Sequence, residues 1–204
     1  IDNFPITGIG INRYPNIVKY LGVIKKAAAV ANYETGKISK EIYEGIVKAC
    51  DDVIAGKYND QFPVDVIQGG AGTSTNMNAN EVIANVALEY MGHQPGQYEF
   101  CSPNDHVNGS QSTNDAYPCA VHLAMYADHL EMVKHLDMLI ESLEKKAEEY
   151  KNIIKMGRTQ LQDAVPMTLG LTFKAFAQSM KNEKEHLLEA AKELLYSNMG
   201  ATAI

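Results

Sequence analysis

The sequence predicts an all-α fold, in which a small N-terminal helical domain is followed by the first long helices of a central helix bundle. Two observations predict this fold. Residues that start and stop helices punctuate the first half of the chain, and two later stretches carry apolar side chains at steps averaging about 3.5 residues. We expect residues 1–113 to form the N-terminal domain and residues 114–204 to begin the bundle, truncated at its far end.

The first two helices are predicted from their ends. One lies within residues 12–34, with Pro15 suited to its first turn and Gly36 just past its end. Ser39 is a good N-cap for the next helix, which is expected to stop before Gly56. These signals give a helical pair at the start of the domain.

A third helix is predicted from about Asn76 to Met91, after the glycine-rich turn at residues 69–72. A polar loop containing two prolines follows over residues 94–109. The N-terminal domain therefore contains three helices and one long connection.

Two long helices are predicted beyond that loop. The first spans about residues 114–150, and its apolar stripe, interrupted by His129, consists of Met125, Met132, Leu136, Leu139, Leu143 and Ala147. A loop is expected over residues 151–167. The second helix carries Phe173, Phe176, Met180, Leu187, Ala191 and Leu194 on one side. This periodicity favours a bundle completed by further sequence or by other subunits, and the alternative is a self-contained antiparallel pair.

Composition excludes several classes of protein. The net charge of −7 makes nucleic-acid binding a poor hypothesis, and no apolar run is long enough for a membrane span. The three cysteines lack a metal-binding spacing and are expected to be free thiols in the cytoplasm. Both ends, at Ile1 and Ile204, are expected to lie inside a longer protein.

Three polar segments interrupt the helical pattern. In the first, residues 69–78, glycines allow close approach to a ligand and the following helix start suits a carboxylate or phosphate. The alternative is a helix start capped by Thr73 or Ser74. In the second, Ser112, Thr113 and Asn114 offer three neutral polar groups within one turn, which can hold an anion.

The second and third segments also have structural interpretations. Asn114 or Asp115 could be the N-cap of the long helix. In the third segment, residues 156–166, Arg158 could grip a carboxylate, but pairing with Asp163 is the favoured interpretation. Thr159 and Gln160 are the better ligand candidates there.

The histidines do not predict a metal site. His122, His129 and His135 lie seven and six residues apart on the first long helix, and this spacing does not bring ligands together as a four-residue step does. His106 is expected to be a surface turn residue, and Cys119 is expected to pack in the interior. We predict no metal ligands in the chain.

The three polar segments, in this order, resemble the signature regions of the aspartase/fumarase superfamily. The matching stretches cover residues 61–81, 111–118 and 157–167, and the resemblance extends over essentially the whole chain. Fumarases usually have Ser where this chain has Ala71, Ser where it has Thr113, and His where it has Gln160. The details therefore resemble the aspartase branch of the superfamily.

This resemblance implies reversible elimination of ammonia from L-aspartate to give fumarate, through an aci-carboxylate intermediate. Thr73, Ser112 and Thr113 would bind the carboxylate next to the carbon that loses its proton, and Asn114 would bind near the amino group. Hydroxyl and amide donors placed in advance stabilise the charge that develops on this carboxylate. Alternatives are a fumarase-type lyase and a non-catalytic helical assembly module.

The resemblance also implies a homotetramer whose sites are built from three chains. Thr159 would contact the other carboxylate from a neighbouring subunit, with Gln160 assisting as a neutral group. The base in this family is a serine in a Gly-Ser-Ser loop, and this chain contains no such sequence. The base serine is therefore expected C-terminal to Ile204, and the 204-residue chain alone is expected to be inactive. No cofactor is expected to be required, although divalent cations activate some aspartases.

Overall fold

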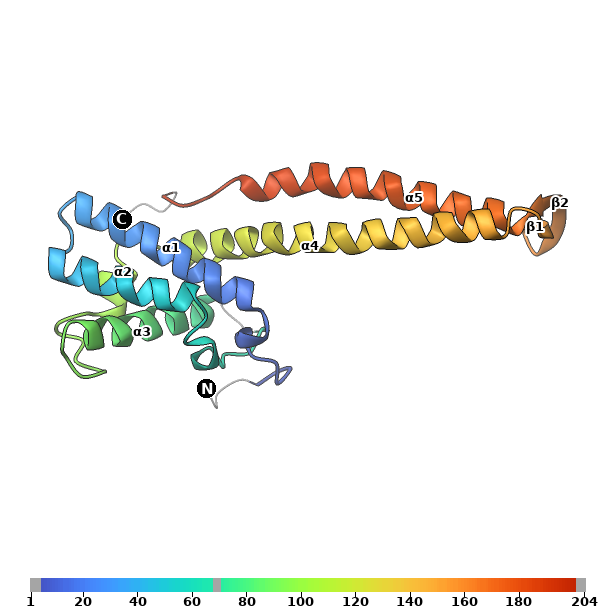
Figure 1. Cartoon of the computed structure of the whole chain (residues 1–204). Coiled ribbons are helices and arrows are strands. Elements are labelled where there is room, and N and C mark those ends of the chain that lie inside the picture. Colours follow the sequence, from blue (N-terminus) through green and yellow to red (C-terminus); the bar gives the residue numbers. More distant parts are fainter. Residues whose placement is uncertain (1–4, 68–70, 201–204) are drawn as a thin grey trace. The chain divides into compact units, whose positions relative to one another are not determined.

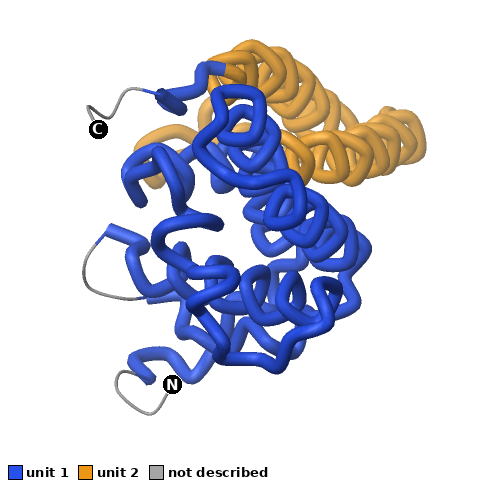
Figure 2. The backbone as a smooth tube through the Cα atoms, turned by 90° about the vertical axis from the view of Figure 1, so that its left-hand side faces the viewer, with its two compact units in different colours: residues 1–125, 196–204 blue, residues 126–195 orange. Residues whose placement is uncertain are grey.

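The structure is a computed structural model that describes residues 5–67 and 71–200, and it divides into two compact units. Unit 1 comprises residues 1–125 and 196–204, and unit 2 comprises residues 126–195 (Figure 2). The predicted helical fold is confirmed, with five α-helices and a single two-stranded sheet in the described ranges (Figure 1). The predicted domain boundary at residues 113/114 lies at the start of helix α4 (Thr113–Glu149), whereas the two units divide within this helix, between residues 125 and 126. The domain assignment therefore stays a prediction.

The first two helices of unit 1 follow the predicted signals. Helix α1 spans Pro15–Glu34 with Pro15 as its first residue, and α2 spans Lys40–Ile54. The backbone N–H of Ile42 donates to Ser39 Oγ at 3.3 Å, which confirms Ser39 as the N-cap. Gly36 follows α1 with a φ of 75°, a left-handed conformation that glycine adopts without strain.

Helix α3 spans Thr73–Tyr90 and begins three residues earlier than predicted. Gly72 is its N-cap, with a left-handed φ of 84°, so Thr73 and Ser74 are helical residues. The prediction that Thr73 or Ser74 caps this helix is wrong, because the turn reaches helical geometry as soon as Gly72 has redirected the chain. The predicted glycine turn is described only from residue 71 onward, since Gly69 and Gly70 lie outside the described residues.

Short helical turns lie before, between and after the long helices. The predicted polar loop at 94–109 contains one π-helical turn, Pro103–Val107. His106 lies in a turn, as expected, but it is half-buried, and its Nδ1 accepts a hydrogen bond from the backbone N–H of Ser102 at 2.8 Å. The remaining short turns in the described ranges are the 3-10 helices Ile11–Arg13, Asn59–Gln61 and Ala191–Leu195.

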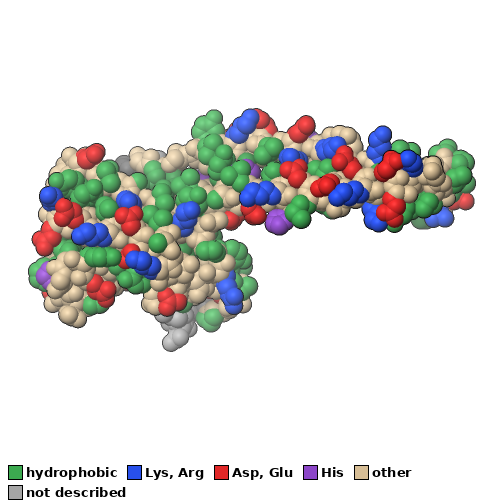
Figure 3. All heavy atoms as spheres, viewed as in Figure 1, with side chains coloured by type: hydrophobic (Ala, Val, Ile, Leu, Met, Phe, Trp, Pro, Cys, Tyr) green, Lys and Arg blue, Asp and Glu red, His purple; other side chains and the backbone are tan. Residues whose placement is uncertain are grey.

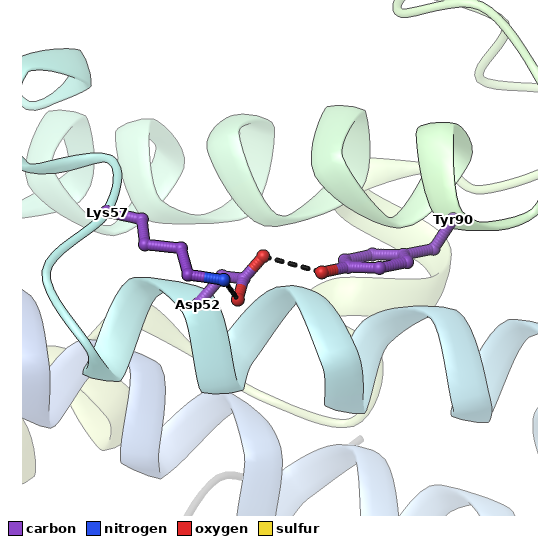
Figure 4. A network of polar contacts seen from close by, with 3 residues as sticks. All are labelled: Asp52, Lys57 and Tyr90. Carbon is purple, nitrogen blue, oxygen red and sulfur yellow. Dashed lines mark hydrogen bonds and ion pairs between the residues drawn. The ribbon is translucent and has the colours of Figure 1, made fainter.

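The core of unit 1 is formed by α1, α2 and α3 together with the first turns of α4 (Thr113–Glu149). A polar network joins α2 to α3 beside this core (Figure 4). The Tyr90 hydroxyl donates to Asp52 Oδ2 at 2.7 Å, and the Lys57 ammonium pairs with the other carboxylate oxygen. The hydrogen bond from Lys57 and then that from Tyr90 hold the pKa of Asp52 below its usual value. The network therefore stabilises the ionised carboxylate at the α2–α3 contact.

Pro118 lies six residues into α4 rather than in its first turn. Because proline has no N–H, the carbonyl of Asn114 lacks the usual helical donor. The Asn198 side-chain amide donates to this carbonyl at 2.6 Å. Asn198 also contacts the buried Cys119 thiol at 3.1 Å, which confirms that Cys119 faces the interior. Asn198 thus supplies the hydrogen bond to Asn114 that Pro118 cannot donate.

Unit 2 contains a β-hairpin where a loop was predicted. Strand β1 (Ile154–Thr159) pairs antiparallel with β2 (Gln162–Thr168), before helix α5 (Leu169–Ala190). The prediction of an irregular loop at 151–167 is therefore wrong. Gln160 and Leu161 form the two-residue turn, and both have a positive φ. Such turns usually carry Asn-Gly or Asp-Gly, so the sequence lacks the residues that announce a hairpin.

The apolar stripe of α4 is divided between two faces in unit 2. Leu136, Leu143 and Ala147 are half-buried and His129 is buried, whereas Met132 is 51% exposed. Ion pairs tie α4 to α5, including Lys181–Glu144 at 2.5 Å and Lys184–Asp137 at 2.6 Å. Figure 3 shows acidic and basic side chains mixed along these helices. One half of the predicted seam is thus at least partly buried, and completion of a larger bundle stays a prediction.

Two further features concern the described residues as a whole. All three cysteines are buried thiols that form no disulfide. Among the helices in residues 5–67 and 71–200, none combines the length and apolar character needed to cross a membrane.

Candidate functional site at the starts of two helices

The candidate residues Ser112, Thr113 and Asn114 lie at the start of α4, where a reciprocal capping box fixes the backbone. Ser112 Oγ accepts from the backbone N–H of Asn114 at 3.1 Å, and the backbone N–H of Ser112 donates to Asp115 Oδ2 at 3.0 Å. Ser112 is therefore the capping residue, and the prediction that Asn114 or Asp115 is the N-cap is wrong. Asp115 is 2% exposed, so the carboxylate that closes the box is shielded from water.

The starts of α3 and α4 are brought together in unit 1. Asn76, in the first turn of α3, donates from Nδ2 to Thr113 Oγ1 at 3.0 Å. A Cβ atom at Gly72 would lie 2.4 Å from the Tyr117 ring, so the two helix starts approach closely only because position 72 is glycine. Thr73, one turn before Asn76, shares this end of α3 with it.

A buried lysine supports the loop before α4. Lys25 Nζ, fully buried on α1, donates to Asn108 Oδ1 at 2.9 Å and to Gln111 Oε1 at 3.0 Å. Burial lowers the pKa of Lys25 to about 7, and the nearby Cys50 thiol offsets part of this effect. The buried Lys25 amine therefore holds the loop that carries Ser112 against α1, and this amine changes its protonation state near neutral pH.

Lys25, Asn76 and Asn108 were not among the predicted site residues. A signal for Lys25 was present, because it lies four residues after Leu21 and four before Ala29 on the apolar face of α1, where a charge needs a buried partner. Asn76 and Asn108 lie within the first two polar segments, but nothing in their spacing indicated that they meet.

The exposed groups of this cluster are neutral. Asn114 and Thr73 are exposed, and Ser112 and Thr113 are half-buried. Hydroxyl and amide groups at helix starts can donate to a carboxylate, and the positive end of the α4 dipole adds to this attraction. The arrangement is therefore suited to an anionic ligand that is recognised by hydrogen bonds.

Thr73 also lines a groove of about 900 Å³ over α3, but the other candidates do not. The acidic residues Asp60, Glu81 and Glu89 line the same groove, so it is unsuited to a dicarboxylate.

Thr159 and Gln160 belong to the hairpin of unit 2. Thr159 ends β1, and Gln160 is the first turn residue, with a φ of 47°; both are exposed. Arg158 Nε lies 3.2 Å from Asp163 Oδ1 across the hairpin, which confirms the favoured pairing of Arg158 with Asp163. The candidate residues are thus divided between the units: Thr73, Ser112, Thr113 and Asn114 lie in unit 1, and Thr159 and Gln160 lie in unit 2.

Potential metal ligands are dispersed in the described part of the chain. Within residues 5–67 and 71–200, no three His, Cys, Asp or Glu side chains are grouped so that they could hold a metal ion. His129 Nδ1 lies within hydrogen-bonding reach of the Tyr126 carbonyl, and His135 lies 3.7 Å from Glu131.

Comparison with known proteins places the chain in a family. A family model described as "Lyase" matches residues 5–204. An aspartate ammonia-lyase of Escherichia coli (strain K12) is 53% identical to the chain over 205 aligned residues, covering 100% of this chain and 43% of that protein. A fumarate lyase:delta crystallin from Brucella melitensis, solved bound to cobalt, matches with a TM-score of 0.89 and 49% identity over 100% of this chain and 44% of that one.

A more distant structure has the same fold. The recombinant class II fumarase from Schistosoma mansoni matches with a TM-score of 0.84 and 34% identity, covering 99% of this chain and 42% of that one. The chain spans less than half the length of each of these relatives. Because the family match extends over almost every residue, the chain belongs to the lyase family of the aspartase/fumarase superfamily.

Proposed function

We propose that the full-length protein containing this chain is an aspartate ammonia-lyase, which eliminates ammonia from L-aspartate to give fumarate. The observation that carries the proposal is the 53% identity to a curated aspartate ammonia-lyase over the whole chain. The neutral donor cluster at the start of α4 supports it, since Ser112, Thr113 and Asn114 are the residue types that can hold a carboxylate whose negative charge increases during the reaction.

The proposed roles rest on the family resemblance, and the position of the donors at two helix starts supports them. Thr73, Ser112 and Thr113 bind the carboxylate next to the carbon that loses its proton, and Asn114 binds near the leaving amino group. Proton removal leaves an aci-carboxylate dianion, whose two oxygens gain charge as the donors stabilise it. Electrons then form the carbon–carbon double bond as ammonia leaves. A serine supplied by sequence outside these 204 residues takes the proton.

Assembly completes the proposed site. Thr159, with Gln160 beside it, binds the second carboxylate from a neighbouring subunit of a homotetramer. The exposed apolar half of the α4 stripe, including Met132 and Leu139, supports this assembly because it has no cover within unit 2. Sedimentation of the full-length protein tests the tetramer, and a monomer that is fully active would contradict it.

A divalent cation is proposed as an optional activator rather than a required cofactor. The cobalt-bound relative from Brucella melitensis supports cation binding in the family. Activity measured after chelation and after re-addition of Mg²⁺ tests this, and complete loss of activity on chelation would contradict it. A cytoplasmic location also stays a prediction, supported by the free thiols.

The ultraviolet absorbance of fumarate tests the reaction. The full-length protein should produce fumarate from L-aspartate and not from L-malate. Activity with malate alone would replace the proposal with a fumarase-type lyase.

Site variants separate catalysis from assembly. Thr113→Ala and Asn114→Ala should each lower kcat/KM by about a hundredfold while leaving the oligomer intact. Ser39→Ala is the matched control, because it also removes a hydroxyl from a helix start but lies outside the cluster. If the site variants dissociate the oligomer and their remaining assembled fraction is fully active, the residues serve assembly instead.

A further inference from the structure

We propose that Lys25, Asn108 and Asn76 are positioning residues that fix the Thr113 hydroxyl as a hydrogen-bond donor toward the substrate carboxylate. The inference rests on the proposed function, which places a carboxylate beside Thr113. It concerns the direction of each hydrogen bond in the buried network rather than the presence of the bonds alone.

The orientation of the Asn108 amide is fixed at both ends. Its Nδ2 donates to the backbone carbonyl of Gln111 at 3.0 Å, and a carbonyl can only accept. Its Oδ1 accepts from Lys25 Nζ at 2.9 Å, and the lysine amine keeps N–H groups to donate whether or not it is protonated. Rotating this amide by half a turn would break the bonds that Oδ1 accepts from Lys25, Asn76 and Asn80, and it would face the amide oxygen toward the Gln111 carbonyl oxygen.

Asn108 in turn fixes the orientation of Asn76. Asn76 lies with its Nδ2 3.1 Å from Asn108 Oδ1 and 3.0 Å from Thr113 Oγ1. If the Asn76 amide were reversed, its oxygen would face the Asn108 oxygen, and two acceptors would repel each other. The two N–H bonds of Asn76 are therefore committed, one to Asn108 and one to Thr113.

The consequence for Thr113 follows from its single proton. Because Oγ1 already accepts from Asn76, the hydroxyl proton has to point away from Asn76. Thr113 is half-buried and its neighbour Asn114 is exposed, so part of the Thr113 side chain remains accessible to a ligand. Lys25 and Asn76 are 0% and 1% exposed, and water cannot easily replace either of them in the network. The hydroxyl is thus a prepared donor rather than a freely rotating group.

A substitution that removes the N–H groups of Asn76 tests this polarity. Asn76→Asp keeps the size of the side chain, but its carboxylate accepts the Thr113 proton and turns it away from the substrate. Asn80→Asp is the matched control, since Asn80 is also buried on α3 and donates to Asn108 Oδ1 at 3.1 Å without contacting Thr113. Both variants are made in the full-length protein, together with Thr113→Val and the Asn76→Asp/Thr113→Val double variant.

The expected result is a coupled loss. Thr113→Val should lower kcat/KM for L-aspartate by about a hundredfold and Asn76→Asp by at least about tenfold, with the double variant no worse than Thr113→Val. Asn80→Asp should lose at least about threefold less than Asn76→Asp, because it disturbs Asn108 in the same way but does not contact Thr113. Equal losses in the two Asn→Asp variants, or losses that multiply in the double variant, would overturn the inference. If Asn76→Asp does not fold, Asn76→Leu, which also lacks the donor, takes its place.

Binding of succinate, an unreactive dicarboxylate, separates this inference from the proposed reaction. If the wild-type protein does not convert L-aspartate, the proposed function fails, but the dissociation constants for succinate still report on Thr113. Asn76→Asp should raise that constant by about tenfold relative to Asn80→Asp. Equal succinate affinities in these two variants would refute the positioning role even in an active enzyme.

Discussion

We expect the stability of the wild-type protein to rise between pH 7 and pH 9, and replacing Lys25 by Met should remove this pH dependence. Burial lowers the pKa of Lys25 from 10.5 to about 7, so between these values the unfolded chain binds a proton here that the folded chain releases. The free energy of unfolding therefore rises with pH through this window. At 1.36 kcal/mol per pKa unit, Lys25 alone contributes a rise of about 2 kcal/mol from pH 7 to pH 9.

The variant also loses the hydrogen bonds from Lys25 to Asn108 and Gln111, each of which costs about 1–3 kcal/mol at every pH. The free energy of unfolding of Lys25→Met, relative to that of wild type, should therefore be highest at pH 7 and lowest at pH 9. Urea unfolding of the full-length protein, followed by circular dichroism at three pH values, measures the difference. Lys26→Met is the control, because Lys26 pairs with Asp51 at the surface at 2.6 Å and should keep the wild-type slope. Equal pH slopes for Lys25→Met and wild type would refute the buried-amine assignment.

Three further outcomes are expected from the geometry. Gly72→Ala should lower the free energy of unfolding by at least about 2 kcal/mol, because the new Cβ would lie 2.4 Å from the Tyr117 ring and the backbone φ is +84°. Thermal unfolding measures this loss, and an unchanged midpoint would contradict the close approach of the two helix starts. Burial alone would raise the pKa of Asp65, but hydrogen bonds from Ile67, Thr7 and Gly8 lower it from 3.8 to about 2. Its stabilisation is therefore complete above pH 3.8 and disappears as the pH falls through about 2, and Asp65→Asn should flatten the acid-unfolding curve there. Arg158→Ala should change stability by less than about 1 kcal/mol, since its ion pair with Asp163 is exposed, and a larger shift in the thermal midpoint would show a hidden role.

The helices were predictable because their end signals act locally. Ser39 caps α2 through a contact only three residues away, and Gly36 and Gly56 adopt positive φ just past the helices that they end. The candidate cluster Ser112–Asn114 was found for the same reason, since its three groups share one turn. Within it, the capping residue was misassigned because Ser112 and Asn114 are both good N-caps.

The hairpin and the buried network were not predictable by the same means. The hairpin turn at Gln160 and Leu161 uses residues that rarely adopt a positive φ, so its signal is absent from the sequence. Asn76 and Asn108 resemble ordinary polar residues until the packing of α1 and α3 brings them together. Only Lys25, on an apolar helical face, carried a visible sign of a buried partner.

The bond between Lys25 and Asn108 joins residues 83 positions apart along the chain. Contacts of such sequence separation form late during folding, because a long stretch of backbone has to be ordered before they stabilise anything. The Thr113 hydroxyl can therefore acquire its direction only after α1, α3 and the loop before α4 have docked. A partly folded protomer with native helices would still lack an aligned donor, so ligand affinity should develop in the last kinetic phase of refolding.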